Sequence, residues 1–351
     1  MSPPPHFVVP GPLDQRTGGY IYDRRIVEGL RASGRAVEVH ELAGAFPKVD
    51  VAARRAAARA IEAMPRSALP VIDGLALPAF ADLTTRLPQP WVALVHHPLA
   101  LETGLSPAEA RRFADLERRL LAQAARVIVT SERTRRDLAA CHLEDRRIGV
   151  VHPGTDPAPL AKGSGGPGLA LLCVASLTPR KGHLVLLEAL HGLSDLDWRL
   201  TCVGSAERDP VCARAIALAC DRLGLRQRVE LAGEHPEADL GRYYDGADLL
   251  VLASYHEGYG MVLAEALARG LPVVATTAGA IPDTVPDGAG LLVPPGDPGA
   301  LAAALRRVMT GPELRAELIA GARAARRNLP AWDDAAGAFA TELAGLARRA
   351  A

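Results

Sequence analysis

Short apolar runs alternate along the whole chain with segments in which apolar residues recur at helical spacing. In the N-terminal part, Tyr22, Ile26 and Leu30 follow one another at four-residue intervals, which predicts a helix. Residues 51–64 are rich in Ala and Arg and are also expected to be helical. The apolar runs predict strands at residues 7–9, 36–42, 70–73, 90–95 and 126–129.

The segment that begins at Ser106 carries a clear helix start. Ser106 can cap the helix, Pro107 suits its first position, and Glu109 completes a capping box. Ser131 is expected to cap a second helix in the same way. The buried face of the first helix is expected to be an apolar stripe of Phe113, Leu116 and Leu120.

The second half of the chain repeats the alternation with longer apolar runs. Nearly continuous apolar strands joined by helices are typical of a parallel sheet covered by helices on both faces. We therefore predict an α/β protein of two Rossmann-like, doubly wound domains that face each other across a cleft, with ligands at the carboxyl ends of the strands. Strands are predicted at residues 169–175, 198–203, 229–231, 248–252, 272–275 and 290–293.

The domain boundary is expected in a segment rich in Pro, Gly and Ala, because residues 163–168 have the composition of a flexible linker. The expected domains are residues 1–157 and 158–328, and 351 residues suit two cores better than one. Residues 329–351 carry a helical pattern. This last helix either crosses back to the N-terminal domain, which we predict, or simply ends the second domain.

Composition and charge narrow the class of protein. The 40 basic residues balance the 40 acidic ones, so charge gives no indication of nucleic-acid binding, although a local patch in contact with an anionic membrane stays compatible with this balance. The first residues lack the pattern of a signal peptide, and no apolar run approaches the roughly 18 residues that span a bilayer. A cytoplasmic protein is expected. Its five scattered cysteines, without a CxxC pair, are expected to be free buried thiols and not a metal site.

A glycine-containing turn between a strand and a helix is the most informative segment of the sequence. Gly258 and Gly260 let backbone N–H groups approach a ligand, and the N-terminus of the following helix can bind a phosphate. Glu257, at the strand's carboxyl end, can reach a sugar hydroxyl, and Glu265, in the helix, can accept hydrogen bonds from a ribose. The alternative is an ordinary glycine turn with two surface glutamates.

A basic pair, Arg180 and Lys181, follows the strand at 169–175 and precedes a helix. Cations at a strand's carboxyl end can neutralise a diphosphate, Arg with a planar fork and Lys as a point charge. Solvated charges at a helix start are the alternative, but cations there oppose the helix dipole. The sequence therefore favours a phosphate-binding pair.

The N-terminal part adds two weaker patterns. Gly18 and Gly19 at a helix start can close over a diphosphate, although an ordinary turn explains them equally well. His96 follows the strand at 90–95, where an imidazole can hydrogen-bond a sugar or move a proton. A structural histidine is the alternative at this position.

From about Leu169 to Pro298 the chain resembles the family 4 retaining glycosyltransferases of the GT-B fold. Residues 257–265 match the E-x7-E motif of that family, and the pattern continues through 271–276, 278–283 and 290–297. The likeness is looser over the N-terminal domain, where acceptors are usually recognised. Three positions differ from the residues that are usual in the family: Ser176 replaces an arginine, Asp283 a glutamate and Pro153 an asparagine.

The resemblance implies transfer of a hexosyl group from a UDP- or GDP-sugar to an acceptor hydroxyl, with retention of configuration. It implies no metal ion and no cofactor, and it leaves open whether the acceptor is a glycan, a lipid or a small molecule. The implied catalytic residues are His96, Glu257, Arg180 and Lys181. The implied donor-binding residues are Gly18, Gly19, Arg180, Lys181, Glu257, Gly258, Tyr259, Gly260, Met261, Val262 and Glu265.

Other functions fit parts of the same sequence. A nicotinamide-dependent dehydrogenase is disfavoured, because its glycine motif should follow the first strand of a domain. A GT-B epimerase or phosphorylase is a closer alternative. A silent protein that binds a sugar nucleotide, or acts as a scaffold, is a third one, since Ser176 removes a charge that the family uses.

Overall fold

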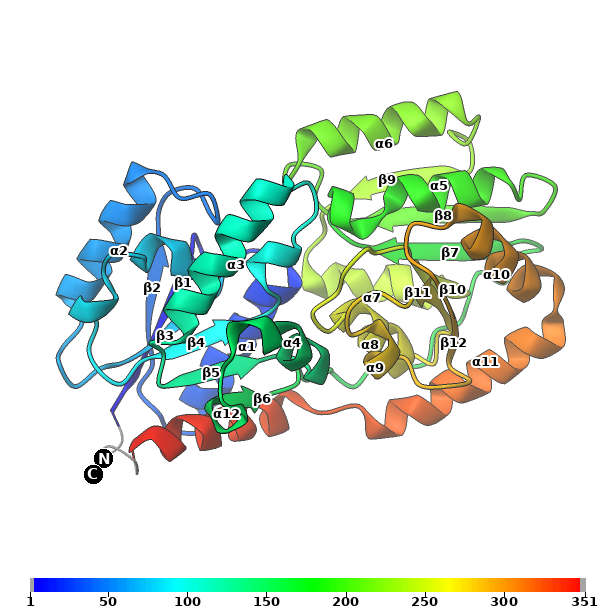
Figure 1. Ribbon diagram of the computed structural model, residues 1–351. Helices are drawn as coiled ribbons and strands as arrows, with labels where there is room; N and C mark the ends of the chain where they lie inside the picture. Colours follow the sequence, from blue (N-terminus) through cyan, green and yellow to red (C-terminus); the bar gives the residue numbers. More distant parts are fainter. Residues whose placement is uncertain (1–2, 348–351) are drawn as a thin grey trace. The chain divides into compact units, whose positions relative to one another are not determined.

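The computed structural model describes residues 3–347 (Figure 1). Its contacts divide the chain into two compact units. Unit 1 comprises the residues up to Gly154 together with those from Pro330 onward, and unit 2 comprises Thr155–Leu329. Each unit holds one parallel six-stranded sheet with helices packed on it. Among the described helices, none combines the length and the apolar character needed to cross a membrane.

The sheet of unit 1 has the order β2-β1-β3-β4-β5-β6. Its strands are β1 (Pro5–Pro10), β2 (Glu38–Leu42), β3 (Leu69–Asp73), β4 (Val92–Val95), β5 (Arg126–Val129) and β6 (Ile148–Val150). Its α-helices are α1 (Gly18–Ala32), α2 (Val51–Ala63), α3 (Pro107–Leu121), α4 (Glu132–Asp137) and α12 (Trp332–Ala347). Its 3-10 turns are η1 (Leu77–Phe80), η2 (Thr84–Arg86), η3 (Leu99–Leu101), η4 (Leu138–Cys141) and η5 (Asp145–Arg147). The strand order reverses between β1 and β3, which makes their carboxyl ends the switch point of this sheet.

Two apolar clusters cover the sheet of unit 1. One is formed with α2, η1 and α3, and the other with α1 and α12. In the second cluster Phe339 of α12 is fully buried, and its ring stacks on that of Phe7 in β1 with 5.6 Å between centroids. Helix α12, at the end of the chain, therefore completes the core of unit 1 (Figure 1).

Helix α3 begins with the predicted capping box, but its buried face differs from the predicted stripe. The Ser106 hydroxyl accepts the N–H of Glu109, whose carboxylate accepts the N–H of Ser106. Leu120 is buried as expected, whereas Phe113 and Leu116 are only half-buried. The acidic Glu117 is buried beside Leu120, because the backbone N–H groups of η3 donate to its carboxylate.

The sheet of unit 2 has the order β12-β11-β10-β7-β8-β9. Its strands are β7 (Leu169–Val174), β8 (Trp198–Val203), β9 (Val229–Gly233), β10 (Leu249–Leu252), β11 (Val273–Thr276) and β12 (Gly290–Val293). Its helices and 3-10 turns are η6 (Pro179–Lys181), α5 (His183–His191), α6 (Pro210–Arg222), α7 (Glu237–Asp245), α8 (Met261–Ala268), α9 (Ile281–Thr284), α10 (Pro298–Thr310), α11 (Pro312–Ala325) and η7 (Arg326–Asn328). The order reverses between β7 and β10, so the carboxyl ends of these two strands form the switch point.

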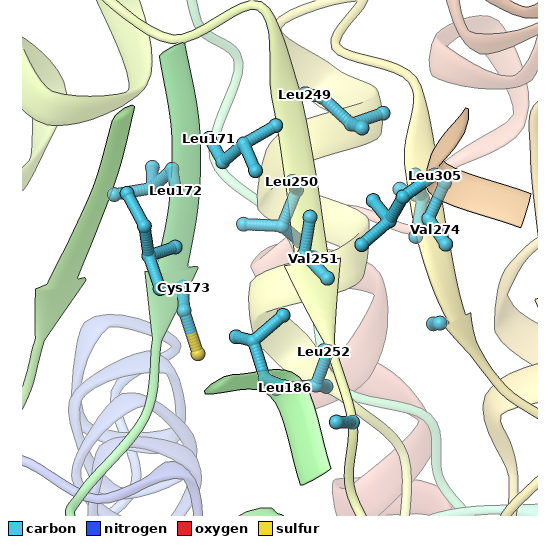
Figure 2. Close-up of a cluster of buried hydrophobic side chains, with 14 of the residues drawn as sticks. Leu171, Leu172, Cys173, Leu186, Leu249, Leu250, Val251, Leu252, Val274 and Leu305 are labelled. Carbon is cyan, nitrogen blue, oxygen red and sulfur yellow. The ribbon is translucent and has the colours of Figure 1, made fainter. Parts of the chain in front are cut away.

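The central strands of unit 2 are apolar on both faces because helices cover both. Figure 1 shows α5 and α6 on one side of this sheet and α7 and α8 on the other. Figure 2 shows part of this core, in which leucines of β7 and β10 lie in one buried cluster with Leu186 of α5 and with Leu305 of α10, which is drawn beside Val274 of β11. Every residue of β10 is fully buried. The continuous apolar runs in the sequence have this origin.

The glycine-containing segment before β7 is fixed to unit 2, so the prediction of a flexible linker there was wrong. The backbone N–H groups of Lys162 and Gly163 donate to the carbonyl of Asp245. Ser164 donates its N–H and its hydroxyl to the carboxylate of Asp248. The division between the units falls earlier, after Gly154. The polar groups of this segment bond to residues more than 80 positions away in the sequence, whereas those of a free linker would bond to water.

The five cysteines are free thiols in the structure, and two of them come together. Cys173 and Cys202 are paired in register on β7 and β8, and both are buried. The imidazole of His183 lies 3.7 Å from the sulfur of Cys173. Cys220 is also buried, whereas Cys141 and Cys212 are half-buried.

Candidate functional site

The loops after β7 and β10 meet at the switch point of unit 2. Gly182 adopts a left-handed conformation with φ +67°, and a Cβ added to it would lie 2.0 Å from the carbonyl oxygen of Ala253. The N–H of Tyr255 donates to the carbonyl of Arg180 at 2.7 Å. Because only glycine permits this close approach, the β7 loop brings its basic pair against the residues that follow β10.

Glu257 is the centre of an ion cluster at this point. Its Oε1 accepts hydrogen bonds from Lys181 Nζ and from the Ser254 hydroxyl, both at 2.6 Å. Its Oε2 lies 3.8 Å from Nη1 of Arg180, which also donates to the carbonyl of His256. The structure thus brings together Arg180, Lys181 and Glu257, three residues that the sequence placed in two separate motifs.

The charges of this cluster depend on one another. Burial alone would raise the pKa of Glu257, but the charges of Lys181 and Arg180 outweigh it and lower the pKa to about 2. Burial lowers the pKa of Lys181, and Glu257 opposes that shift. Glu257 is therefore ionised between two cations. Arg180 and Lys181 keep 18% and 16% of their side chains exposed, which leaves both cations accessible to a ligand.

The glycine turn leads into helix α8, as predicted. Gly260, with φ +88°, occupies the N-cap of α8, and within the described chain no side chain caps that helix. The carbonyl of Tyr259 accepts the hydroxyl of Thr284. Gly279, from the loop after β11, packs against the backbone of Glu257, where a Cβ would come within 2.1 Å of the carbonyl oxygen. The turn is held from two sides, and Gly258, Met261 and Val262 lie in or directly after it.

Glu265 lies in α8 and contacts a different partner. Its Oε2 accepts the hydroxyl of Tyr244 in α7 at 2.7 Å. Burial raises the pKa of Glu265, while the bond from Tyr244 and the charge of Arg269 partly oppose this shift. No described residue from 3 to 347 hydrogen-bonds the second oxygen of Glu265, Oε1.

In unit 1, His96 lies directly after β4 and meets two carboxylates that the sequence analysis missed. Its Nε2 is 3.0 Å from Oδ1 of Asp23 in α1 and 3.2 Å from Oδ2 of Asp73 at the end of β3. Gly19 borders the same ring, and a Cβ there would lie 3.1 Å from Cδ2 of His96. Gly18 begins α1. The two predicted motifs of unit 1 therefore adjoin at one place.

Four polar residues that bond to the predicted site residues were absent from the prediction: Asp23, Asp73, Ser254 and Tyr244. Some of them could have been detected in the sequence. Asp73 ends a predicted strand, and Ser254 follows one closely, so both occupy the strand ends where ligands bind. Asp23 interrupts the buried side of a helix that also buries Tyr22. Tyr244 left no such pattern, because it lies inside helix α7 and not at a strand end.

Comparison with known protein families matches both parts of the chain. Residues 24–159 match the model described as Glycosyltransferase Family 4, and residues 168–311 match the one described as Glycosyl transferases group 1. Together the two matches span most of the chain. The chain belongs to the family 4 glycosyltransferases. The dehydrogenase interpretation is thereby excluded.

Curated relatives are about one third identical to this chain over the residues that align. A D-inositol 3-phosphate glycosyltransferase of Mycobacterium sp. (strain KMS) is 35% identical over 202 residues, which cover 54% of this chain and 45% of the relative. One from Xylanimonas cellulosilytica is 34% identical over 271 residues, covering 71% of this chain and 64% of the relative. The matches thus span about half to two thirds of the relatives' length.

Solved structures show the same fold over nearly the whole chain. A sucrose-phosphate synthase from Thermosynechococcus elongatus superposes with a TM-score of 0.84 at 23% identity, covering 99% of both chains. The Anabaena protein HepE, solved in complex with UDP-glucose, superposes with a TM-score of 0.78 at 20% identity, covering 97% of this chain and 99% of HepE. The GT-B fold predicted from the sequence is confirmed.

Proposed function

We propose that this protein is a retaining, metal-independent glycosyltransferase that moves a hexosyl group from a UDP- or GDP-sugar to an acceptor hydroxyl. The observation that carries the proposal is the cluster of Arg180, Lys181 and Glu257 at the switch point of unit 2. It combines two partly exposed cations with a buried carboxylate beside the start of α8. This combination suits a ligand that has a diphosphate and a sugar hydroxyl next to each other.

The diphosphate is assigned to the cationic side of this cluster. Arg180 and Lys181 offer charge-assisted hydrogen bonds, and the uncapped start of α8 adds backbone N–H donors. The solved neighbour HepE was crystallised with UDP and with UDP-glucose, which supports a nucleotide-sugar donor. Ser176 supplies no charge, so in this proposal Arg180 takes over the part of the missing arginine.

The carboxylates are assigned to hydroxyl groups of the donor. Glu257 would accept from the transferred sugar, and Oε1 of Glu265 would accept from the ribose. His96 would donate a hydrogen bond to the transferred sugar. In the reaction the acceptor oxygen attacks the anomeric carbon while the bond to the diphosphate breaks, and the cations stabilise the negative charge that develops on the leaving group.

Donor binding can be tested by thermal shift with UDP-, GDP- and ADP-sugars in the presence of EDTA. A donor at a hundred times its Kd stabilises the folded protein by about 2.7 kcal/mol. We expect stabilisation by one nucleotide class, its loss in Glu265→Ala, and its retention in the exposed control Glu317→Ala. A shift that disappears with EDTA would contradict metal independence, and no shift with any donor would contradict the assignment of the site.

Turnover distinguishes a transferase from the remaining alternatives. An acceptor panel that includes D-inositol 3-phosphate, after the curated relatives, should release nucleoside diphosphate only when the correct acceptor is present. A silent binding protein would hold the donor without release. An epimerase would convert the donor without any acceptor, and a phosphorylase would require inorganic phosphate.

A further inference from the structure

Three ionisable side chains from three elements of unit 1 meet at one ring nitrogen. Nε2 of His96 faces both Asp23 and Asp73, at 3.0 and 3.2 Å. The second oxygen of Asp73 accepts the N–H of Leu75 at 2.6 Å. The second oxygen of Asp23 is buried and has no hydrogen-bond partner in the described part of the chain. Asp23 is completely buried, and Asp73 is 4% exposed.

This arrangement costs free energy unless the charges compensate one another. Two carboxylates in an apolar core repel each other, and each loses its hydration. An imidazole nitrogen between them removes part of that cost only if it carries a proton, because carboxylate oxygens accept hydrogen bonds and cannot donate them when ionised. With both carboxylates ionised, this geometry therefore favours a proton on Nε2 of His96.

The titration behaviour agrees with this protonation state. Burial by itself lowers the pKa of His96, but the charges and hydrogen bonds of Asp23 and Asp73 outweigh it and raise the pKa to about 10. Burial raises the pKa of Asp23 to about 7, although His96 opposes this. Near neutral pH Asp23 is thus partly protonated, and His96 remains a cation.

The remaining surroundings of His96 leave one edge of its ring for a ligand. Asp23 faces it from α1 and Asp73 from β3, and the ring of Tyr22 meets it edge-on with 5.3 Å between centroids. Gly19 packs against Cδ2, beside Nε2. The side chain keeps 16% of its surface exposed, and within residues 3–347 nothing hydrogen-bonds its Nδ1.

We propose that Asp23 and Asp73 are positioning residues that hold Nε2 of His96 from two sides, so that the ring is fixed as a cation and presents Nδ1–H as a hydrogen-bond donor to the transferred sugar. The contact with the sugar rests on the proposed function, whereas the fixed, charged ring does not. Neither carboxylate touches the sugar. The alternative is that Asp23, Asp73 and His96 have a structural role only. They would then join α1 to the sheet without controlling the charge of His96.

The charge of His96 can be measured without any activity. In protein labelled with 15N-histidine, the ring resonances of His96 are identified by their loss in His96→Gln. We expect both ring nitrogens to remain protonated at pH 8.5 in the wild type. In Asp23→Asn and Asp73→Asn the ring should lose a proton below that pH. The exposed Asp82→Asn serves as a control and should behave like the wild type.

The role of the charge is measured by the pH profile of kcat/KM for the donor, which reports groups of the free enzyme. For Asp73→Asn we expect nearly wild-type values at pH 6 and a loss of roughly tenfold at pH 8.5, where His96 becomes neutral. A uniform loss across this pH range, with an unchanged profile, would assign the carboxylates a structural role and overturn the proposal.

Two further outcomes are decisive. A neutral His96 ring at pH 7 in the wild type would overturn the proposal directly. So would a stoichiometric metal ion in the purified protein that is lost in both Asp variants, because an ion would then occupy the place of the proton. If no donor binds or turns over, the proposed function fails, and the 15N spectra still decide whether Asp23 and Asp73 fix a charged His96.

Discussion

At the scale of single residues, Glu257 pairs with the two cations that we assign to the diphosphate of the donor. In the free protein its carboxylate neutralises Lys181 and Arg180 and takes a third bond from Ser254. In the proposed function a ligand diphosphate would bring negative charge and compete with Glu257 for the same cations. A neutral nucleoside would not compete, so we expect the cluster to discriminate between the two by charge.

The stability of unit 2 is expected to depend on pH through Glu257. Its pKa is about 2 in the folded protein against an ordinary value of 4.5, so its stabilising contribution is complete above pH 4.5 and is lost as the pH falls toward 2. Between pH 7 and pH 4 the difference in free energy of unfolding between the wild type and Glu257→Gln should shrink by roughly 1 kcal/mol. Urea unfolding at each pH measures it.

The control for this experiment is Glu317→Gln, an exposed position in α11. Its difference from the wild type should stay constant over the same pH range. A constant difference for Glu257→Gln as well would show that the ion cluster does not hold the carboxylate as described.

The sequence could reveal the charged residues of unit 2 but not the way they pair. Arg180 and Glu257 each come shortly after an apolar strand, and this position alone predicts a place at the ligand-binding edge of a parallel sheet. That Glu257 accepts from Lys181 depends on the approach of two loops separated by 76 residues. Asp23 was missed for a related reason, because it lies on a helix and not at a strand end.

At the scale of elements, most strands were predictable. Helices cover both faces of each sheet, so the strands are nearly continuous apolar runs in the sequence. The strands β5, β8 and β12 have the predicted bounds, since their apolar runs end at polar or turn-forming residues. Strand β6 (Ile148–Val150) was not predicted, because it has only three residues and a central glycine. The prediction of a flexible linker at residues 163–168 failed for a different reason. The segment has the composition of a flexible chain, but its hydrogen-bond partners lie far away in the sequence.

The junction between the β7 and β10 loops depends on the absence of a side chain at Gly182. In Gly182→Ala the new Cβ would overlap the carbonyl of Ala253, so the two loops must separate and Lys181 must lose its contact with Glu257. We expect donor binding to weaken by at least tenfold, which corresponds to about 1.4 kcal/mol. Isothermal titration with the donor found by thermal shift measures this loss.

Gly224→Ala is a matched control for that substitution. Gly224 has nearly the same φ, +69°, but an added Cβ there meets nothing within 4 Å. It therefore carries the same conformational strain of about 1 kcal/mol without the steric overlap. Equal donor affinity in the two variants would mean that the contact between the loops does not shape the site.

At the scale of the whole molecule, each unit is a doubly wound sheet whose candidate residues gather at its own switch point. In unit 1 the strand order reverses between β1 and β3, next to Gly19 and Asp73. In unit 2 it reverses between β7 and β10, next to Lys181 and Glu257. The alternation of strands and helices predicts this repetition. The last helix is the exception to the sequential order, since α12 follows unit 2 in the chain but packs in unit 1.

The membership of α12 in unit 1 leads to a prediction about where the protein loses stability. Phe339 is fully buried and stacks on Phe7, so Phe339→Ala should cost about 3 to 5 kcal/mol. This loss should appear as faster amide hydrogen exchange in residues 3–154 and 330–347, measured by mass spectrometry, while residues 155–329 keep their protection.

Leu305→Ala in α10 is the reciprocal control, because Leu305 is equally buried in the core of unit 2. It should weaken protection in residues 155–329 alone. If Phe339→Ala instead accelerated exchange evenly through both units, α12 would stabilise the molecule as one cooperative body, and the two cores could not be regarded as independent.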